Sequence, residues 1–276
     1  MKKFENILIC TDLDGTLLNS KKQISRENLE AIEYFKSEGG YFTFVTGRPP
    51  VIAFNICDMI SPNAPFGCFN GGGLYDHVAG KYLWYEEMSH SVMQMLDDVR
   101  AEFSDIGFQL NTAGPIYFCN DSPTMEGFRA VTGAPKLIKD YRDIKEPFVK
   151  VVFGDSDPEK IKRLAAYLAA HPMADQFEFV SAESTLYEIL VKGTHKGAVI
   201  SRLCEILGVD RRRTVAIGDY DNDVGMLREA GVGVAVSNAS PAAMAAADVM
   251  LGASNNEHAI AKLIHDIEIG KIDLAI

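Results

Sequence analysis

The stretch Ile7-Leu8-Ile9-Cys10-Thr11-Asp12-Leu13-Asp14-Gly15-Thr16 joins a run of apolar residues to a turn that carries two aspartates. A short, continuously apolar run is typical of a buried parallel strand, because both faces of such a strand are covered. The run therefore predicts a strand over residues 7–10. In open α/β folds, ligands bind at the carboxyl ends of the strands, so the acidic turn is a candidate site.

The residues after this turn predict a parallel crossover. Ser25 fits the N-cap of a helix, apolar residues then recur at helical spacing, and Gly39-Gly40 ends the helix. Residues 41–45 have the composition of a second strand. A strand–helix–strand unit of this kind is right-handed in nearly all known sheets. The same pattern returns after residue 196, with strands expected at 214–217 and 233–236 and a last helix around 260–267.

The middle of the chain has a different character. Asn70-Gly71-Gly72-Gly73 marks a turn, and apolar residues between 92 and 103 fit one face of a helix. A second helix is expected from Pro158. Short strands are expected at 108–110, 116–119, 148–153, 177–180 and 186–191. We therefore predict an α/β fold: a Rossmann-like parallel-sheet core with helices on both faces (residues 1–83 and 190–276), interrupted by an inserted α+β domain (residues 84–189).

The composition of the chain disfavours several classes of partner and of site. The 276 residues carry a formal net charge of −11, which disfavours nucleic acid and acidic membrane surfaces as partners. Five cysteines without a CxxC pair predict neither a disulfide framework nor a zinc site. The apolar run after Lys2 and Lys3 is too short for a signal peptide, and no run approaches the ~20 apolar residues of a membrane span. We expect a cytoplasmic protein.

Polar side chains follow several of the predicted strands. Asp12 and Asp14 follow the first, Thr46 ends the second, and Asp219 and Asp223 follow a strand about 200 positions later. The carboxyl ends of parallel strands share one edge, so these residues can meet. Clustered carboxylates repel one another and stay ionised cheaply only around a cation, and oxygen ligands suit Mg²⁺. The sequence therefore predicts a magnesium site.

This arrangement favours phosphoryl transfer. A carboxylate can attack phosphorus to give an aspartyl phosphate. The reaction then needs mainly alignment and neutralisation of charge. Magnesium, Lys196, the Thr46 hydroxyl and backbone N–H groups of the turns at Gly15 and Gly47 are candidates for both tasks.

Four short motifs give the chain a specific resemblance. They are DxDGT at Asp12–Thr16, a strand-ending threonine at Thr46, a lysine at Lys196, and GDxxND at Gly218–Asp223. The chain resembles the haloacid dehalogenase superfamily of phosphatases, and more closely the Cof-type hydrolases, which insert a large α/β cap between the second and third motifs. The steps Asn70-Gly71 and Asn238-Ala239 also look familial, and the resemblance covers essentially the whole chain.

The resemblance implies a role for each aspartate. Asp12 is the expected nucleophile and a magnesium ligand. Asp14 is expected to protonate the leaving oxygen and then to activate water, while its backbone carbonyl binds magnesium. Asp219 is expected to bind magnesium directly, and Asp223 to bind it or to orient its waters.

The residues expected to hold the phosphoryl group are Thr46, Gly47, Lys196 and Asn222. Two further residues are weaker candidates for substrate binding. Arg48 either grips the substrate phosphate or pairs with a carboxylate, and Asn70 belongs to the familial Asn-Gly step.

The predicted function is hydrolysis of a small phosphorylated metabolite, such as a sugar phosphate or a phosphorylated cofactor. The predicted cap would set the choice of substrate by closing over the site. A phosphomutase of the same superfamily and a phospho-accepting signalling module remain as alternatives, and the oligomeric state is open between monomer and homodimer.

Overall fold

The structure is a computed structural model that describes residues 2–274, and these divide into two compact units. Residues 48–52 and 84–194 form the second unit, and the other described residues form the first. Two elements, α2 (Pro50–Ile60) and β5 (Lys81–Tyr85), contain residues of both units. The predicted assignment of residues 1–83 and 190–276 to a catalytic core and of 84–189 to a cap stays a prediction.

The first unit alternates strands and helices along the chain. Its other strands are β1 (Leu8–Thr11), β2 (Tyr41–Phe44), β3 (Phe66–Cys68), β4 (Gly73–Asp76), β11 (Thr214–Gly218), β12 (Val232–Ala235) and β13 (Val249–Met250). Its other helices are α1 (Arg26–Ser37), α6 (Gly197–Leu207), α7 (Val224–Glu229), α8 (Pro241–Ala246) and α9 (Ala259–Glu268).

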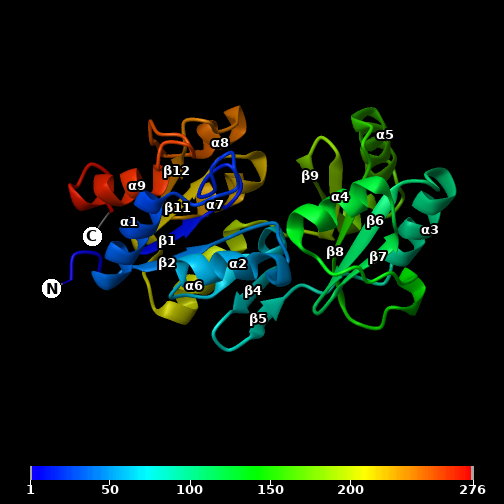
Figure 1. Ribbon diagram of the computed structural model, residues 1–276, viewed down its shortest axis with the longest axis horizontal. Coiled ribbons are helices and arrows are strands. Elements are labelled where there is room, and N and C mark those ends of the chain that lie inside the picture. The colour runs from blue at the N-terminus through cyan, green and yellow to red at the C-terminus, as the bar shows by residue number, and fades with distance from the viewer. Residues whose placement is uncertain (1, 275–276) are drawn as a thin grey trace. The chain divides into compact units, whose positions relative to one another are not determined.

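A five-stranded parallel sheet in the order β13-β12-β11-β1-β2 forms the centre of this unit (Figure 1). At its middle, Thr11 of β1 lies beside Ile217 of β11 and Phe44 of β2. The three strands therefore end at the same level, and the turns that follow them share one edge of the sheet. The predicted parallel α/β core is confirmed. A smaller antiparallel sheet, β3-β4-β5, was not expected from the sequence.

Helices α1 and α9 lie side by side although they come from opposite ends of the chain (Figure 1). Ser25 caps α1 as expected, because its side chain accepts a hydrogen bond from the backbone N–H of Asn28. The Asn28 side chain in turn reaches α9. Its Oδ1 accepts from the backbone N–H of Ala261 at 3.0 Å, in the first turn of α9, where the helix offers that group no partner.

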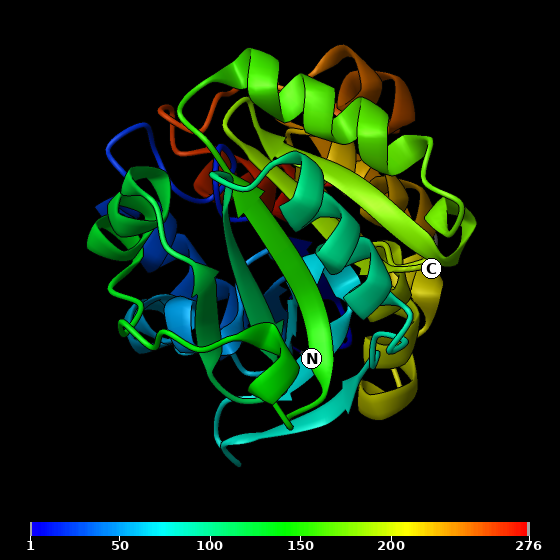
Figure 2. The ribbon, with the colours of Figure 1, turned by 90° about the vertical axis from the view of Figure 1, so that its right-hand side faces the viewer.

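The second unit has its own antiparallel sheet, in the order β7-β6-β8-β10-β9. The strands are β6 (Gly107–Thr112), β7 (Ile116–Asn120), β8 (Phe148–Gly154), β9 (Phe177–Glu183) and β10 (Leu186–Val191). The helices are α3 (Val92–Glu102), α4 (Pro123–Thr132) and α5 (Pro158–Ala169). Helices α3 and α5 lie on one face of the sheet, and their apolar sides bury that face in a shared core (Figure 2). All five strands expected from the sequence are present, and α4 is an addition.

Among residues 2–274, no helix combines the length and the apolar character that crossing a bilayer requires.

We predict that Asn28→Ala destabilises the first unit. The substitution leaves the partly buried N–H of Ala261 without its acceptor and empties the buried position of Asn28, which costs about 1–3 kcal/mol of the free energy of unfolding. Chemical denaturation measures the loss. The control is Asn256→Ala, since Asn256 is exposed and accepts its hydrogen bonds from Ser20, which is also exposed. It should change the free energy by no more than about 0.5 kcal/mol. Equal losses in the two variants would contradict the role given to Asn28.

Candidate active site

Asp12 stands directly after β1 at the carboxyl edge of the parallel sheet. Its backbone N–H donates to the carbonyl of Ile217 at 2.9 Å, so the chain is still held by the sheet at this residue. The side chain is buried, with 6% of the residue exposed. A carboxylate in this position is fixed by the strand that precedes it.

The turn after β11 supplies two more buried carboxylates. Asp219 follows the strand directly, and Asp223 lies one turn later with no exposed surface. Oδ2 of Asp223 accepts from the backbone N–H groups of Asp219 and Tyr220 at 2.9 and 3.0 Å. The Asp223 carboxylate therefore closes its own turn and holds Asp219 in place. Carboxylate oxygens of Asp12, Asp219 and Asp223 lie within 4.8 Å of one another.

Lys196 lies between two of these carboxylates. Its Nζ donates to Oδ1 of Asp12 and to Oδ1 of Asp223, both at 2.6 Å, and only 1% of the residue is exposed. The residue stands at the N-cap of α6, so the helix start aims the side chain into the cluster. The sequence alone also fits a solvated lysine at a helix start, and the structure rules that reading out.

Burial and the neighbouring charges shift the pKa values of Asp12, Asp219 and Lys196. Burial raises the pKa of Asp12 well above its usual value, although the charge of Lys196 opposes the shift. Burial also raises the pKa of Asp219, to about 6. Burial by itself lowers the pKa of Lys196, but Asp12 and Asp223 outweigh it and raise this pKa above its ordinary value. The cluster therefore holds more negative charge than Lys196 alone balances, which favours a second cation.

The Gly15–Thr16 step brings the first acidic turn against Asp219. Oγ1 of Thr16 donates to Oδ1 of Asp219 at 2.6 Å. Gly15 has φ of +92°, and a Cβ placed on it would lie 2.3 Å from Oδ2 of Asp219. Only glycine fits here, because the backbone is left-handed and the carboxylate occupies the side-chain position. Nδ2 of Asn238 adds a hydrogen bond to the carbonyl of Gly15 at 2.9 Å.

Asp14 has a different environment from Asp12, although it is only two residues away. Its side chain is 37% exposed, and Oδ1 accepts from Nζ of Lys22 at 2.7 Å. Asp14 is still close enough to the cluster to help raise the pKa of Asp219. One aspartate of the turn is thus buried and fixed, while the other is partly exposed.

The polar residues after β2 and β3 also come together. The backbone N–H of Asn70 donates to the carbonyl of Thr46 at 3.0 Å, and Oδ1 of Asn70 accepts from Nδ2 of Asn222 at 3.1 Å. A Cβ on Gly47 would lie 2.9 Å from Oδ1 of Asn70. Asn70 itself adopts a left-handed backbone, with φ of 57°. The candidate phosphate-binding residues Thr46, Gly47 and Asn222 are therefore joined through Asn70.

The remaining candidate, Arg48, belongs to the second unit, and its role stays a prediction. Three residues of the site were given no role by the sequence analysis: Thr16, Lys22 and Asn238. Thr16 lies inside the DxDGT motif, and Asn238 lies in the step Asn238-Ala239 that resembles the family. Both residues could therefore have been proposed from the sequence. Lys22 lies in an exposed turn, and nothing in the sequence indicates that its side chain reaches Asp14.

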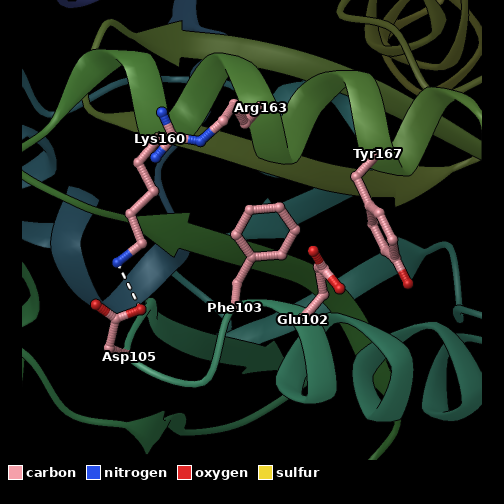
Figure 3. A pocket seen from close by; sticks show the side chains of 6 residues that line it. All are labelled: Glu102, Phe103, Asp105, Lys160, Arg163 and Tyr167. Atoms are coloured by element: carbon pink, nitrogen blue, oxygen red, sulfur yellow. Dashed lines mark ion pairs between the residues drawn. The ribbon is translucent and has the colours of Figure 1, made fainter.

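A shallow hollow of about 550 Å³ lies between α3 and α5 of the second unit (Figure 3). Its lining residues are Glu102, Phe103, Asp105, Lys160, Arg163 and Tyr167. Lys160 binds Asp105 at 2.7 Å and Asp155 at 2.8 Å, so its charge is used within the protein. The aromatic rings of Phe103 and Tyr167 meet edge to face. We assign no chemistry to this hollow.

Comparison with known proteins identifies the family. The sequence model of the haloacid dehalogenase-like hydrolases matches residues 9–264. The chain therefore belongs to this family, and the resemblance drawn from the four motifs, including the Cof-type group, is confirmed.

Individual relatives agree with this assignment. A putative phosphatase of Bacillus subtilis, YxeH, is 29% identical over 281 residues, which cover 96% of this chain and 99% of the relative. The 5-amino-6-(5-phospho-D-ribitylamino)uracil phosphatase YitU of the same organism is 28% identical, covering 94% and 96% of the two chains. A crystal structure of a haloacid dehalogenase-like hydrolase from Bacteroides thetaiotaomicron superposes with a TM-score of 0.83 at 25% identity, covering 95% and 99%. The chain is a phosphatase of this family.

We predict that Gly15→Ala removes most of the phosphatase activity. The left-handed backbone alone costs about 1–2 kcal/mol of stability with alanine, and the new Cβ also displaces the Asp219 carboxylate. Because displacement by about 1 Å can reduce turnover about hundredfold, phosphate release should fall by at least that factor.

Gly80→Ala is the matched control, since Gly80 also has a positive φ of +66° but nothing lies within 4 Å of its Cβ position. It should lose similar stability and keep its activity. Equal activity in the two variants would contradict the packing described for Gly15 and Asp219.

Proposed function

We propose that the chain is a Mg²⁺-dependent phosphatase that hydrolyses a small phosphorylated metabolite through an aspartyl phosphate on Asp12. One observation carries the proposal. The buried carboxylate of Asp12 lies among Asp219, Asp223 and Lys196 at the carboxyl edge of a parallel sheet. This combination supplies a fixed nucleophile and a cationic contact for the developing charge, which are the main needs of phosphoryl transfer.

The proposed reaction has two displacements. In the first, an oxygen of Asp12 forms a bond to phosphorus, the bond from phosphorus to the ester oxygen breaks, and Asp14 gives that oxygen its proton. In the second, Asp14 takes a proton from water, the water oxygen attacks phosphorus, and the bond to Asp12 breaks with release of phosphate. The partial exposure of Asp14 suits this exchange of protons with substrate and water.

The donor set fits a magnesium ion. Carboxylate oxygens of Asp12, Asp219 and Asp223 lie within 4.8 Å of one another, and Mg²⁺ prefers a few carboxylates completed by water and substrate oxygens. We propose that Asp12 and Asp219 bind the ion directly, that Asp14 adds its backbone carbonyl, and that Asp223 binds it or orients its waters. When bound, the ion would neutralise charge on the phosphoryl group.

The proposed phosphate contacts are Thr46, Gly47, Lys196 and Asn222, with Arg48 and Asn70 as additional substrate contacts. The Asn70–Asn222 hydrogen bond supports a common role for these two amides. We assign the choice of substrate to the domain of residues 84–189. The named activity of the relative YitU, on a phosphorylated ribityl compound, supports a small metabolite as the substrate.

We predict that Asp12→Asn abolishes phosphate release from a panel of phosphorylated metabolites. The amide cannot act as the nucleophile, and loss of a covalent nucleophile lowers turnover by at least about ten-thousandfold. An excess of chelator should stop the wild type in the same assay.

The matched control is Asp221→Asn, because Asp221 lies in the same motif as Asp219 but is exposed and accepts from Ser240. It should stay within about threefold of the wild type. Full activity of Asp12→Asn would refute the mechanism. Transfer of the phosphoryl group back to product without free phosphate would favour a phosphomutase, and a long-lived phosphoprotein without turnover would favour a signalling module.

Magnesium should also stabilise the fold without any substrate. At about 100 times its dissociation constant, a ligand that binds only the folded state adds about 2.7 kcal/mol. For a chain of this size, the melting temperature should therefore rise by several degrees in thermal unfolding. In Asp219→Asn this rise should disappear, while the melting temperature in chelator stays unchanged or increases, because one of the mutually repelling carboxylates is gone. A full magnesium response in Asp219→Asn would exclude the proposed metal site.

A further inference from the structure

The lysine that contacts Asp14 comes from a turn eight residues further along the chain. Residues 19–23 form this turn, which we call the Lys22 turn. The backbone N–H of Lys22 donates to the carbonyl of Asn19 at 2.8 Å, and Oδ1 of Asn19 accepts from two further backbone N–H groups of the turn at 2.9 and 3.0 Å. The turn is therefore closed by its own hydrogen bonds. From it, Nζ of Lys22 reaches Oδ1 of Asp14 at 2.7 Å.

Hydrogen bonds also join the backbone after Asp14 to the backbone before the Lys22 turn. Leu18, directly before the turn, is buried, and its carbonyl accepts from Nδ2 of Asn255 at 2.9 Å. The backbone N–H of Asn255 donates to Oδ1 of Asn238 at 2.9 Å. Nδ2 of Asn238 in turn donates to the carbonyl of Gly15, directly after Asp14. Both segments that carry the ion pair are thus held in place by one chain of contacts.

Stability does not explain the contact between Lys22 and Asp14. The two side chains are 59% and 37% exposed, and an exposed ion pair contributes little because water screens the charges and two side chains lose freedom. Lys22 also has a left-handed backbone, with φ of 57°, which is unfavourable for a residue other than glycine. An unfavourable local arrangement that the surrounding structure maintains is an indication of function.

The task proposed for Asp14 depends on the direction of its carboxyl group. Proton transfer requires that group within hydrogen-bond reach of the ester oxygen and of the attacking water. A partly exposed carboxyl group rotates freely unless a hydrogen bond restricts it, and Lys22 supplies such a bond to Oδ1. Lys196 restricts the carboxylate of Asp12 through a bond of the same kind. Each aspartate of the turn therefore has a lysine that comes from another segment of the first unit.

We propose that Lys22 is a positioning residue for Asp14. Its ammonium group holds the Asp14 carboxyl group in the orientation that exchanges protons with the ester oxygen and with water. The inference rests on the proposed function, because it concerns the acid and base of that reaction. It follows that removal of Lys22 slows each step in proportion to how much that step needs proton transfer.

The first test compares phenyl phosphate with p-nitrophenyl phosphate, two esters that differ by one nitro group. Phenolate is the stronger base and needs a proton to leave, whereas p-nitrophenolate leaves without one. Lys22→Met removes the ammonium group and keeps a long side chain. It should lower kcat/KM for phenyl phosphate by at least about tenfold, which is part of the roughly 10²- to 10⁴-fold that general acid–base catalysis supplies. It should leave kcat/KM for p-nitrophenyl phosphate within about threefold.

The second test follows the second displacement, which needs the base whatever the ester. Rapid acid quenching during a single turnover of p-nitrophenyl phosphate measures the loss of the phosphoryl group from the protein. This loss should be at least about tenfold slower in Lys22→Met than in the wild type. In the Asp14→Asn background, Lys22→Met should change the rate by less than about twofold, because a residue that acts through Asp14 then has nothing to position.

Lys21→Met is the matched control, since Lys21 is the exposed neighbour of Lys22 in the same turn. It should leave both esters and the loss of the phosphoryl group unaffected. The melting temperature of Lys22→Met should stay within about 2 °C of the wild type, because an exposed ion pair stabilises little.

Several results would overturn the inference. Equal losses of kcat/KM on the two esters would show that Lys22 contacts the phosphoryl group itself. Losses that add in the double variant, or unchanged kinetics in Lys22→Met, would show that it does not act through Asp14. Absence of phosphate release by the wild type from both phenyl esters and from every metabolite of the panel would instead refute the proposed function.

Discussion

The repulsion among three buried carboxylates, Asp12, Asp219 and Asp223, is the constraint on which the first unit depends. Burial raises the pKa of Asp12 and Asp219, so the folded state resists holding them both ionised. Lys196 balances part of the charge through two hydrogen bonds of 2.6 Å. Replacing buried charged groups by apolar residues of similar volume often leaves a fold equally stable or makes it more stable, so stability alone does not explain this cluster. The cluster is therefore best explained by chemistry, and the parallel sheet is the framework that holds it together.

The same turn places two aspartates in different surroundings, which suits the different tasks that we propose for them. Asp12 continues the strand and is buried against Lys196, while the side chain of Asp14 is 37% exposed beside Lys22. A fixed carboxylate suits attack on phosphorus, and a partly exposed one suits proton exchange.

Periodicity and the four motifs predicted the parallel sheet and the meeting of residues about 200 positions apart, because parallel strands end at one edge whatever their separation in sequence. They did not predict the hairpin β4–β5, whose strands are only partly buried and lack a clear alternation. Helix α4 was also missed, since its ten residues include a glycine and few apolar positions. The contact from Lys22 to Asp14 was missed as well, because it depends on the path of an exposed turn, which local pattern does not determine.

The most direct test of the central claim is to locate the phosphoryl group during turnover. Asp14→Asn should slow the second displacement, because the water loses its base, whereas the first displacement needs no proton when the leaving group is as good as p-nitrophenolate. Acid quenching of this variant with p-nitrophenyl phosphate and Mg²⁺ should therefore trap a phosphoprotein. Mass spectrometry of the digested protein should then find one phosphoryl group on the peptide that contains Asp12, and none in Asp12→Asn. A phosphoryl group on another residue, or phosphate release by the wild type without any phosphoprotein in either variant, would contradict the account.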